Sequence, residues 1–238
     1  MNFPDNQLAR LFQRRHFDSS IIILRIRWYI TYKLSYRDLV AIMAERNVDV
    51  AHTTILRWVQ RYVPEFEKRW QRYARPVGTS GRVDETYLKV KGKWIYLYRA
   101  VDRAGQTVDF LLSEHRDIAA AKRFFAQAIK KRGVPDKITL DGYAATHVAL
   151  AELQEEDALP TTLTVRANKY LNNVIEQDHR RVKQRVRSML GFKRFANATI
   201  TISGIELVHQ IKKNQFDISA FCVPSALTPQ VWEAVLAT

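Results

Sequence analysis

Three acidic side chains stand in settings from which a fold could bring them together. Asp84 lies inside a strand-like run, a place where carboxylates are disfavoured. Asp141 follows a short apolar run, and Glu176 opens a helical pattern. Aspartate and glutamate occupy 24 of the 238 positions, so many trios of acids can be drawn and only the settings distinguish this one. Asp84, Asp141 and Glu176 are therefore our candidate catalytic and metal-binding residues.

Such a trio is typical of one kind of chemistry. Converging carboxylates repel one another, and cations are needed to stabilise the cluster. Oxygen ligands without a supporting set of histidines or cysteines favour Mg²⁺ or Mn²⁺ over zinc. Two such ions about 3.5–4 Å apart can activate the attacking oxygen and stabilise the leaving oxygen at a phosphodiester. The trio therefore predicts phosphoryl transfer with two Mg²⁺ or Mn²⁺ ions as cofactors.

Each acid also has a structural interpretation that the sequence leaves open. Asp84 could protect an edge strand from aggregation. Asp141, which precedes Gly142, could belong to an ordinary turn. Glu176 stands three residues after Asn173 and could complete a capping box at the helix start.

Neighbouring titratable residues are expected to lie outside the site. Glu85 follows Asp84 in the same strand, so its side chain should point to the opposite face. His147, His179 and His209 lack the spacing of metal ligands, and we expect them to be structural or on the surface.

The elements that must position the acids begin after a break at Gly78-Thr79-Ser80-Gly81, where the hydrophobic period changes from 3.6 to 2. We expect strands at 83–90, 94–101, 107–112, 137–140 and 161–165, helices at 118–131 and up to about 157, and mostly helical structure from there to about 215. This order predicts an α/β ribonuclease H-like domain. Its first and fourth strands lie side by side and the start of the late helix crosses them, so the three acids would converge.

The first two strands are joined by a hairpin turn at Lys91-Gly92-Lys93. In the second strand Trp94, Tyr96 and Tyr98 alternate with aliphatic residues, which makes one face aromatic. Burial beneath helices explains this face better than stacking on nucleic acid, so we expect it in the core.

A basic stripe follows the third acid. Arg180, Lys183 and Arg187 stand four, seven and eleven residues after Glu176, on the same helix face. A carboxylate at the head of such a stripe suits a phosphate backbone that enters a metal site.

The first 75 residues are helical in pattern. One helix is expected from Ile21 to about Thr31, a second after the capping residue Ser35, and a third from about His52 to Val63, ended by Pro64. The third helix docks through Ile55, Trp58, Val59 and Tyr62 and presents Thr53, Thr54, Arg57, Gln60 and Arg61 elsewhere. These hydroxyl, amide and guanidinium groups can read base edges and phosphates, which favours a DNA-binding helix-turn-helix over an ordinary solvated face.

Composition supports a polyanionic partner. Lys and Arg number 38 against 24 Asp and Glu, a net charge of +14. The single cysteine, Cys222, excludes an internal disulfide framework and suits a reducing compartment. No apolar run approaches a membrane span, and the start of the chain does not have the pattern of a secretory signal. We expect two domains, 1–75 and 76–238, in a cytoplasmic protein that associates with the nucleoid when bound to DNA.

The spacing of the acids, with 34 residues between Asp141 and Glu176, resembles the DDE transposases of prokaryotic insertion sequences, and in particular the insertion-sequence-six family. The matching segments are 35–39, 54–62, 83–90, 94–102, 168–180, 189–193 and 203–206. The resemblance implies an integrase- and transposase-type catalytic core in which Asp84, Asp141 and Glu176 bind the metal ions and Lys183 contacts DNA near the reacting phosphate. One departure is local, because Gly142-Tyr143 follows the second aspartate where the family often has lysine.

By the same resemblance the protein is a transposase that moves by a replicative, cointegrate-forming route. Its helix-turn-helix would bind the terminal inverted repeats of an element, and its catalytic domain would cleave the strands and join them to target DNA. Joining two ends requires at least two subunits, so we expect a homodimer or a larger assembly. Two other hypotheses stay open: a DNA-binding regulator whose ribonuclease H-like part is a non-catalytic scaffold, and a nuclease that cuts without joining.

Overall fold

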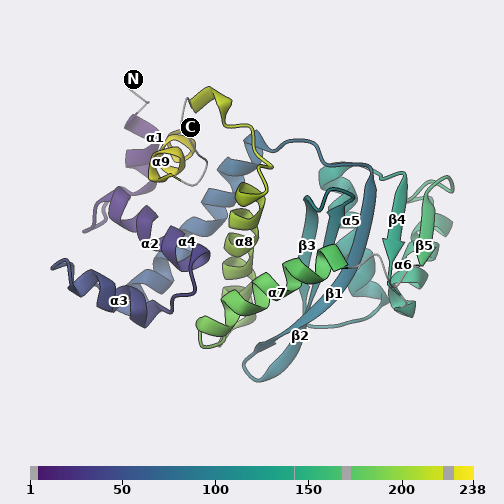
Figure 1. Cartoon of the computed structure of the whole chain (residues 1–238), viewed down its shortest axis with the longest axis horizontal. Helices are drawn as coiled ribbons and strands as arrows, with labels where there is room; N and C mark the ends of the chain where they lie inside the picture. Colours follow the sequence, from purple (N-terminus) through teal and green to yellow (C-terminus); the bar gives the residue numbers. More distant parts are fainter. Residues whose placement is uncertain (1–4, 142, 168–172, 222–227) are drawn as a thin grey trace. The chain divides into compact units, whose positions relative to one another are not determined.

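The computed structural model describes residues 5–141, 143–167, 173–221 and 228–238 (Figure 1). Gly142, Cys222 and the segment 168–172, which holds part of the motif before Glu176, lie outside the described residues. The chain forms two compact units, one of residues 1–75 and 184–238 and one of residues 76–183.

The first unit is helical. Its elements are α1 (Asp5–Leu11), α2 (Ser19–Thr31), α3 (Tyr36–Ala44), α4 (His52–Trp70) with the short 3₁₀ helix η1 (Gln71–Tyr73), the end of α7 (Asn173–Ser188), α8 (Phe195–Lys212), the 3₁₀ helix η3 (Ser219–Phe221) and α9 (Pro229–Ala237). The predicted capping box is present: the backbone N–H of Asp38 donates to the Ser35 hydroxyl, and that of Ser35 donates to the Asp38 carboxylate. The three helices expected for a helix-turn-helix are α2, α3 and α4.

The prediction that the third helix ends at Pro64 is wrong, because α4 continues through this proline to Trp70. Proline removes one backbone donor from a helix and strains the preceding turn. Here the apolar stripe of α4 extends to Phe66 and Trp70, both fully buried. Trp70 packs against Phe216 and Trp232, with ring centroids 5.1 and 5.4 Å away. Burial of these large side chains offsets the break in the hydrogen-bond ladder.

Residues 184–238 group with the N-terminal helices, which differs from the expected second domain of 76–238. The physical cause is the apolar surface of α8, where Ile202, Ile205 and Val208 are buried. Gly204 allows α8 to pack closely against α2, because a Cβ at this position would meet the Ile30 side chain at 2.8 Å.

The second unit is built on a mixed sheet of five strands in the order β3-β2-β1-β4-β5. The strands are β1 (Ser80–Val90), β2 (Lys93–Asp102), β3 (Thr107–Ser113), β4 (Lys137–Leu140) and β5 (Thr164–Ala167). The first three are antiparallel neighbours, and β4 pairs in parallel with both β1 and β5. The hairpin turn predicted at Lys91-Gly92-Lys93 is present as a two-residue turn, and Lys91 and Gly92 both have the positive φ that such a turn requires. This topology confirms the ribonuclease H-like fold class.

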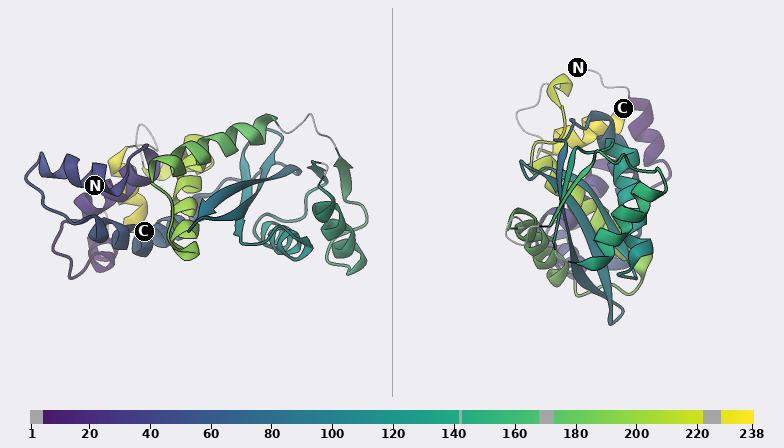
Figure 2. Two further views of the ribbon diagram at one scale, coloured as in Figure 1. Left: turned by 90° about the horizontal axis from the view of Figure 1, so that it is seen from below. Right: turned by 90° about the vertical axis from the view of Figure 1, so that its right-hand side faces the viewer.

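Helices cover both faces of the sheet. Figure 2 shows α5 (Ile118–Arg132) and α6 (Ala144–Glu155) on one face and the first turns of α7 on the other. The apolar core of the unit lies beneath α5 and α6 and includes Tyr98, Phe124 and Leu140. Tyr98 is buried as expected, but Trp94 is 52% exposed, so the expectation of a wholly buried aromatic face is wrong. Trp94 is the second residue of β2, next to the hairpin turn.

None of the described helices is both long enough and apolar enough to cross a membrane.

Candidate metal centre

The pairing of two strands places the first two acids at one edge. β1 pairs with β4 only as far as Val83 and Leu140. Asp84 is the residue of β1 that follows Val83, and Asp141 is the residue that follows Leu140 at the end of β4. Both carboxylates therefore lie where the parallel pairing ends. This is the convergence that the strand order predicts.

Glu85 belongs to the same cluster. Ligand oxygens of Asp84, Glu85 and Asp141 all lie within 4.8 Å of one another. The expectation that Glu85 lies outside the site is therefore wrong, although its strand position is on the opposite face from Asp84. Because β1 has no β4 partner beyond Val83, both carboxylates can reach Asp141 around the open edge.

Glu176 lies in the first turn of α7 and is exposed. It is outside the group of oxygens within 4.8 Å among the described residues, but its charge acts on Asp84. Burial, the charge of Asp141 and the charge of Glu176 together raise the pKa of Asp84 to about 6. The charges of the other two predicted acids, Asp141 after β4 and Glu176 of α7, therefore both act on Asp84 of β1.

Burial and the charge of Asp141 raise the pKa of Glu85 to about 7. Its side chain is only 2% exposed, and its Oε1 atom has no hydrogen-bond partner among the described residues. Carboxylates held this close favour either protonation or a bound cation. The donor set, oxygens from two aspartates and a glutamate with Glu176 nearby, fits Mg²⁺ or Mn²⁺.

Residues after β4 and before α5 hold the cluster in place. The backbone N–H of Tyr143 donates to Asp141 Oδ1 at 3.0 Å. The Arg116 guanidinium lies 3.3 Å from Glu85 Oε2 and 3.6 Å from the centroid of the Tyr143 ring, whose hydroxyl donates to the Arg116 carbonyl. Arg116 is thus a cation beside the cluster. His147, expected to be structural, contacts the Asp141 carbonyl oxygen through Nε2 at 3.0 Å.

A buried ion pair fixes α7 on the sheet. Arg99 of β2 is fully buried, and its Nη2 lies 3.3 Å from Asp178 Oδ2. His179 is also buried, with Nδ1 3.6 Å from Asp84 Oδ2. Burial and the nearby Arg99 and Lys183 lower the pKa of His179 to about 3, so its ring is neutral near pH 7.

Sequence reasoning missed Glu85, Arg116, Asp178 and the contact of His179 with the site. The available signal was spacing, because Asp178 and His179 follow Glu176 by two and three residues on one helix. No spacing connects Arg116 with Glu85, which meet only through the fold.

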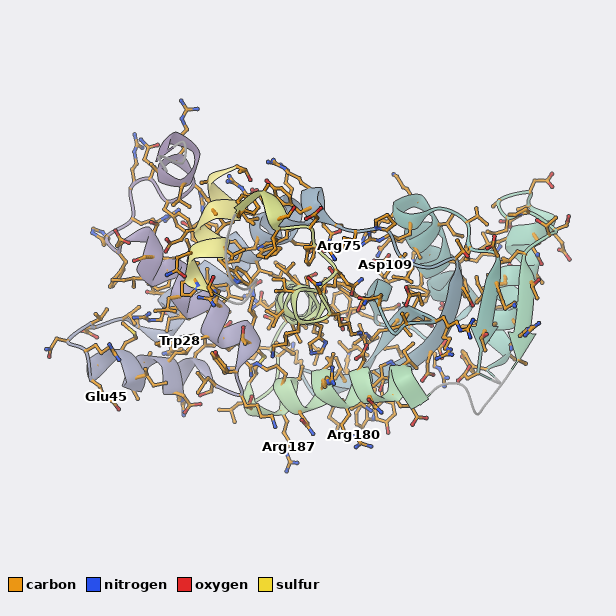
Figure 3. The ribbon with its side chains drawn as sticks, turned by 45° about the horizontal axis from the view of Figure 1, so that its top comes forward. Trp28, Glu45, Arg75, Asp109, Arg180 and Arg187 are labelled. Atoms are coloured by element: carbon orange, nitrogen blue, oxygen red, sulfur yellow. The ribbon has the colours of Figure 1, made fainter. Side chains whose placement is uncertain are left out.

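The predicted DNA-contacting residues lie largely at the surface. Arg180 and Arg187 are exposed and project from the outer side of α7, as Figure 3 shows. Lys183 is half-buried, with Nζ 4.4 Å from the centroid of the Tyr87 ring. Of the five residues of α4 predicted to contact DNA, Thr53, Arg57 and Arg61 are exposed. Thr54 and Gln60 are half-buried. The Gln60 amide donates to the Asn197 carbonyl at 3.5 Å.

The strand order, with Asp84 in β1 just beyond its pairing with β4 and Asp141 directly after β4, is that of a ribonuclease H-like domain. Residues 78–215 match a protein family described as "DDE domain". The Staphylococcus aureus "Transposase for insertion sequence-like element IS431mec" is 38% identical over 211 residues, which cover 88% of this chain and 92% of the relative. The S. aureus "Transposase for insertion sequence element IS257 in transposon Tn4003" is 37% identical over 211 residues, with the same coverage. The chain belongs to this DDE transposase family of insertion-sequence-six elements.

Solved structures with a similar fold include viral integrase cores. The HTLV-2 integrase catalytic core domain in complex with magnesium (trimeric form) is 14% identical, covers 55% of this chain and 86% of its own, and has a TM-score of 0.42. The catalytic core domain of BIV integrase is 15% identical, covers 60% of this chain and 88% of its own, and also has a TM-score of 0.42.

Proposed function

We propose that this transposase binds the terminal inverted repeats of its element and catalyses metal-dependent cleavage and transfer of DNA strands. The observation that carries the proposal is the meeting of Asp84 and Asp141 at the open edge of the sheet, with Glu176 acting on Asp84 from α7. The family membership supports the same reaction class.

In this proposal Asp84, Asp141 and Glu176 hold two divalent ions, Mg²⁺ or Mn²⁺. When bound, such ions supply Lewis-acid assistance to the attacking and leaving oxygens of a phosphodiester. The protein's other residues hold the metal-binding carboxylates in position. Tyr143 orients Asp141 through its N–H, and the Arg99–Asp178 pair holds the helix that carries Glu176. No covalent link between protein and DNA is required.

DNA binding is assigned to two surfaces. On α4, Thr53, Thr54, Arg57, Gln60 and Arg61 would contact the terminal repeat, and on α7, Arg180, Lys183 and Arg187 would contact the backbone near the reacting phosphate. The excess of 14 positive charges supports both assignments. With roughly 6–10 phosphate contacts, affinity should fall about 10³- to 10⁵-fold between 50 and 200 mM salt. Joining two ends requires a homodimer or a larger assembly.

The deciding experiment is a joining assay with the purified chain, its element ends, target DNA and Mg²⁺. Asp84→Asn should abolish both cleavage and joining while binding of the end survives. Asp136→Asn is the matched control, since it makes the same change at an exposed position just before β4. Full joining by Asp84→Asn would overturn the assignment of Asp84 to the metal site. Neither cleavage nor joining by the unmodified chain, with end binding intact, would favour a DNA-binding regulator. Cleavage without joined products by the unmodified chain would indicate a nuclease.

A further inference from the structure

The end of the β1–β2 hairpin presents two large aromatic side chains to solvent. Tyr87 is 53% exposed and Trp94 is 52% exposed. Their rings meet edge to face, with centroids 4.9 Å apart and an interplanar angle of 84°. Large aromatic side chains are usually well buried in proteins, so an exposed, mutually packed pair indicates a binding surface.

Two lysines complete this pair. Lys89 Nζ lies 4.6 Å from the centroid of Trp94, and Lys183 Nζ lies 4.4 Å from that of Tyr87. We call Tyr87, Trp94, Lys89 and Lys183 the hairpin platform. The segment 86–98 also contains Lys91 and Lys93 and has no acidic residue.

This chemistry selects among possible occupants. An identical hairpin from a second copy would bring lysines 89, 91 and 93 against their counterparts, so repulsion opposes self-association. Nucleic acid satisfies both features, because phosphates pair with lysines and bases stack on aromatic rings. Inside a duplex the base faces are covered by neighbouring pairs, so rings can stack on successive bases only where those bases are unpaired. The occupant that fits is therefore a stretch of unpaired nucleotides.

The platform and the carboxylate cluster share two elements, β1 and α7. Tyr87 is three residues along β1 from Asp84, about 10 Å at the rise of a strand. Lys183 is seven residues along α7 from Glu176, also about 10 Å at the rise of a helix. At about 3.4 Å per nucleotide of a stacked strand, this distance corresponds to roughly three nucleotides.

We propose that the hairpin platform binds unpaired nucleotides of the DNA strand, roughly two to three positions from the phosphate at the metal centre. Tyr87 and Trp94 stack on the bases, and Lys89 and Lys183 contact the phosphates between them. The identity of that phosphate rests on the proposed function. The consequence is that the DNA end separates into single strands when it engages the site, and that the platform captures one of them.

The first test measures binding of a single-stranded oligothymidylate and of an end duplex to the full chain by fluorescence anisotropy, without divalent metal. Trp94→Ala and Tyr87→Ala should each weaken binding of the single strand about 5- to 100-fold and leave the duplex affinity unchanged. Trp94→Phe keeps a stacking face and should retain most of the affinity. Lys89→Ala removes one positive charge from the platform. Lys130→Ala, which removes one positive charge at an exposed position of α5, is its control. Unchanged single-strand binding by both alanine variants would overturn the proposal, as would an equal loss for both DNA forms.

The second test separates this proposal from the proposed function. In the joining assay, Trp94→Ala should be slower than the unmodified chain on paired ends, and the defect should shrink when the last three base pairs are mismatched. Asp84→Asn should be inactive on both substrates but bind the single strand normally. If Asp84→Asn joined DNA while Trp94→Ala lost single-strand binding, the metal assignment would fail and the platform would stand. A defect of Trp94→Ala that is equally large on mismatched ends would exclude a role in capturing unpaired bases.

Discussion

The two faces of the sheet around β1 and β2 are both covered, but they differ in what they bury. Beneath α5, the side chains of Val83, Tyr98 and Phe124 form an apolar core. Beneath α7, the neighbouring strand positions bury Arg99 against Asp178 and bring Asp84 to His179. Adjacent residues of one strand thus enter an apolar and a charged environment.

This contrast separates two physical tasks. Apolar burial stabilises the fold roughly in proportion to area and needs no particular partner. Buried charges cost desolvation free energy, and a buried pair is often no more stabilising than apolar residues of similar volume. The charged face instead positions a side chain. The Arg99–Asp178 ion pair fixes one orientation of α7 and therefore the position of Glu176. We infer that the α5 face supports the fold and the α7 face supports the site.

The largest expected loss of stability comes from the apolar face. Phe124→Ala should lower the free energy of unfolding by about 3–5 kcal/mol, because it removes a fully buried ring and leaves a cavity. Denaturant unfolding measures this loss. Mn²⁺ affinity of the folded fraction, measured by titration calorimetry below the unfolding transition, should be unchanged. A parallel loss of metal affinity would break the division between the two faces.

On the charged face, Asp178→Asn should lower the free energy of unfolding by about 3 kcal/mol, since it leaves Arg99 buried without its anionic partner. It should also weaken Mn²⁺ binding about 10- to 100-fold, because Glu176 is held less firmly. The double variant Arg99→Met, Asp178→Leu sharpens the comparison. Its stability should largely recover while its Mn²⁺ affinity stays low. Recovery of both would show that the pair has no positioning role.

The parts of the site that could be predicted from sequence are those fixed by local pattern and strand order. The run 137–140 forms β4 with the predicted bounds, and its end places Asp141 beside the residue that follows Val83. The capping box at Ser35 is likewise a local hydrogen-bond pattern, independent of tertiary context. In each case the determinant lies within a few residues of the feature it specifies.

The structure differs from the predictions at features that are determined by packing between residues far apart in the sequence. Alternation along a strand places Glu85 and Asp84 on opposite faces, but it does not show that the β4 pairing stops at Val83 and leaves an open edge. Proline is a local stop signal, and only the burial of Phe66 and Trp70 carries α4 beyond it. Trp94 is exposed at the hairpin end of β2, and alternation along the strand does not show which of its positions are buried in the fold.

The binding of metal should depend on pH. The pKa values of Asp84 and Glu85 are raised to about 6 and about 7, chiefly by burial, so protons occupy these carboxylates at mildly acidic pH. A divalent ion must displace them, and Mn²⁺ affinity should therefore rise with pH up to about 7 and then level. Calorimetry at pH 6 in buffers of different ionisation enthalpy should detect proton release, which Asp84→Asn should reduce. Affinity that is flat between pH 5 and 8 would contradict this account.

The smallest expected effect concerns the metal-free stability of Glu85→Gln. A carboxyl whose pKa rises from 4.5 to about 7 on folding favours the folded state fully below pH 4.5, and that contribution is lost as the pH rises through 7. Glutamine has no such dependence. In the presence of a chelator, the variant should match the unmodified chain near pH 4 and be more stable by about 1–2 kcal/mol at pH 8.

Thermal or urea unfolding between pH 4 and 8 measures this difference, and Glu155→Gln, the same change at an exposed position of α6, is the control. The control should show a much smaller change than Glu85→Gln. If Glu85→Gln were instead less stable at pH 8, the ionised pair of Glu85 with Arg116 would be stabilising. Glu85 and Arg116 would then form an ordinary stabilising ion pair. The carboxylate of Glu85 would not carry an unfavourable charge that a bound cation could neutralise.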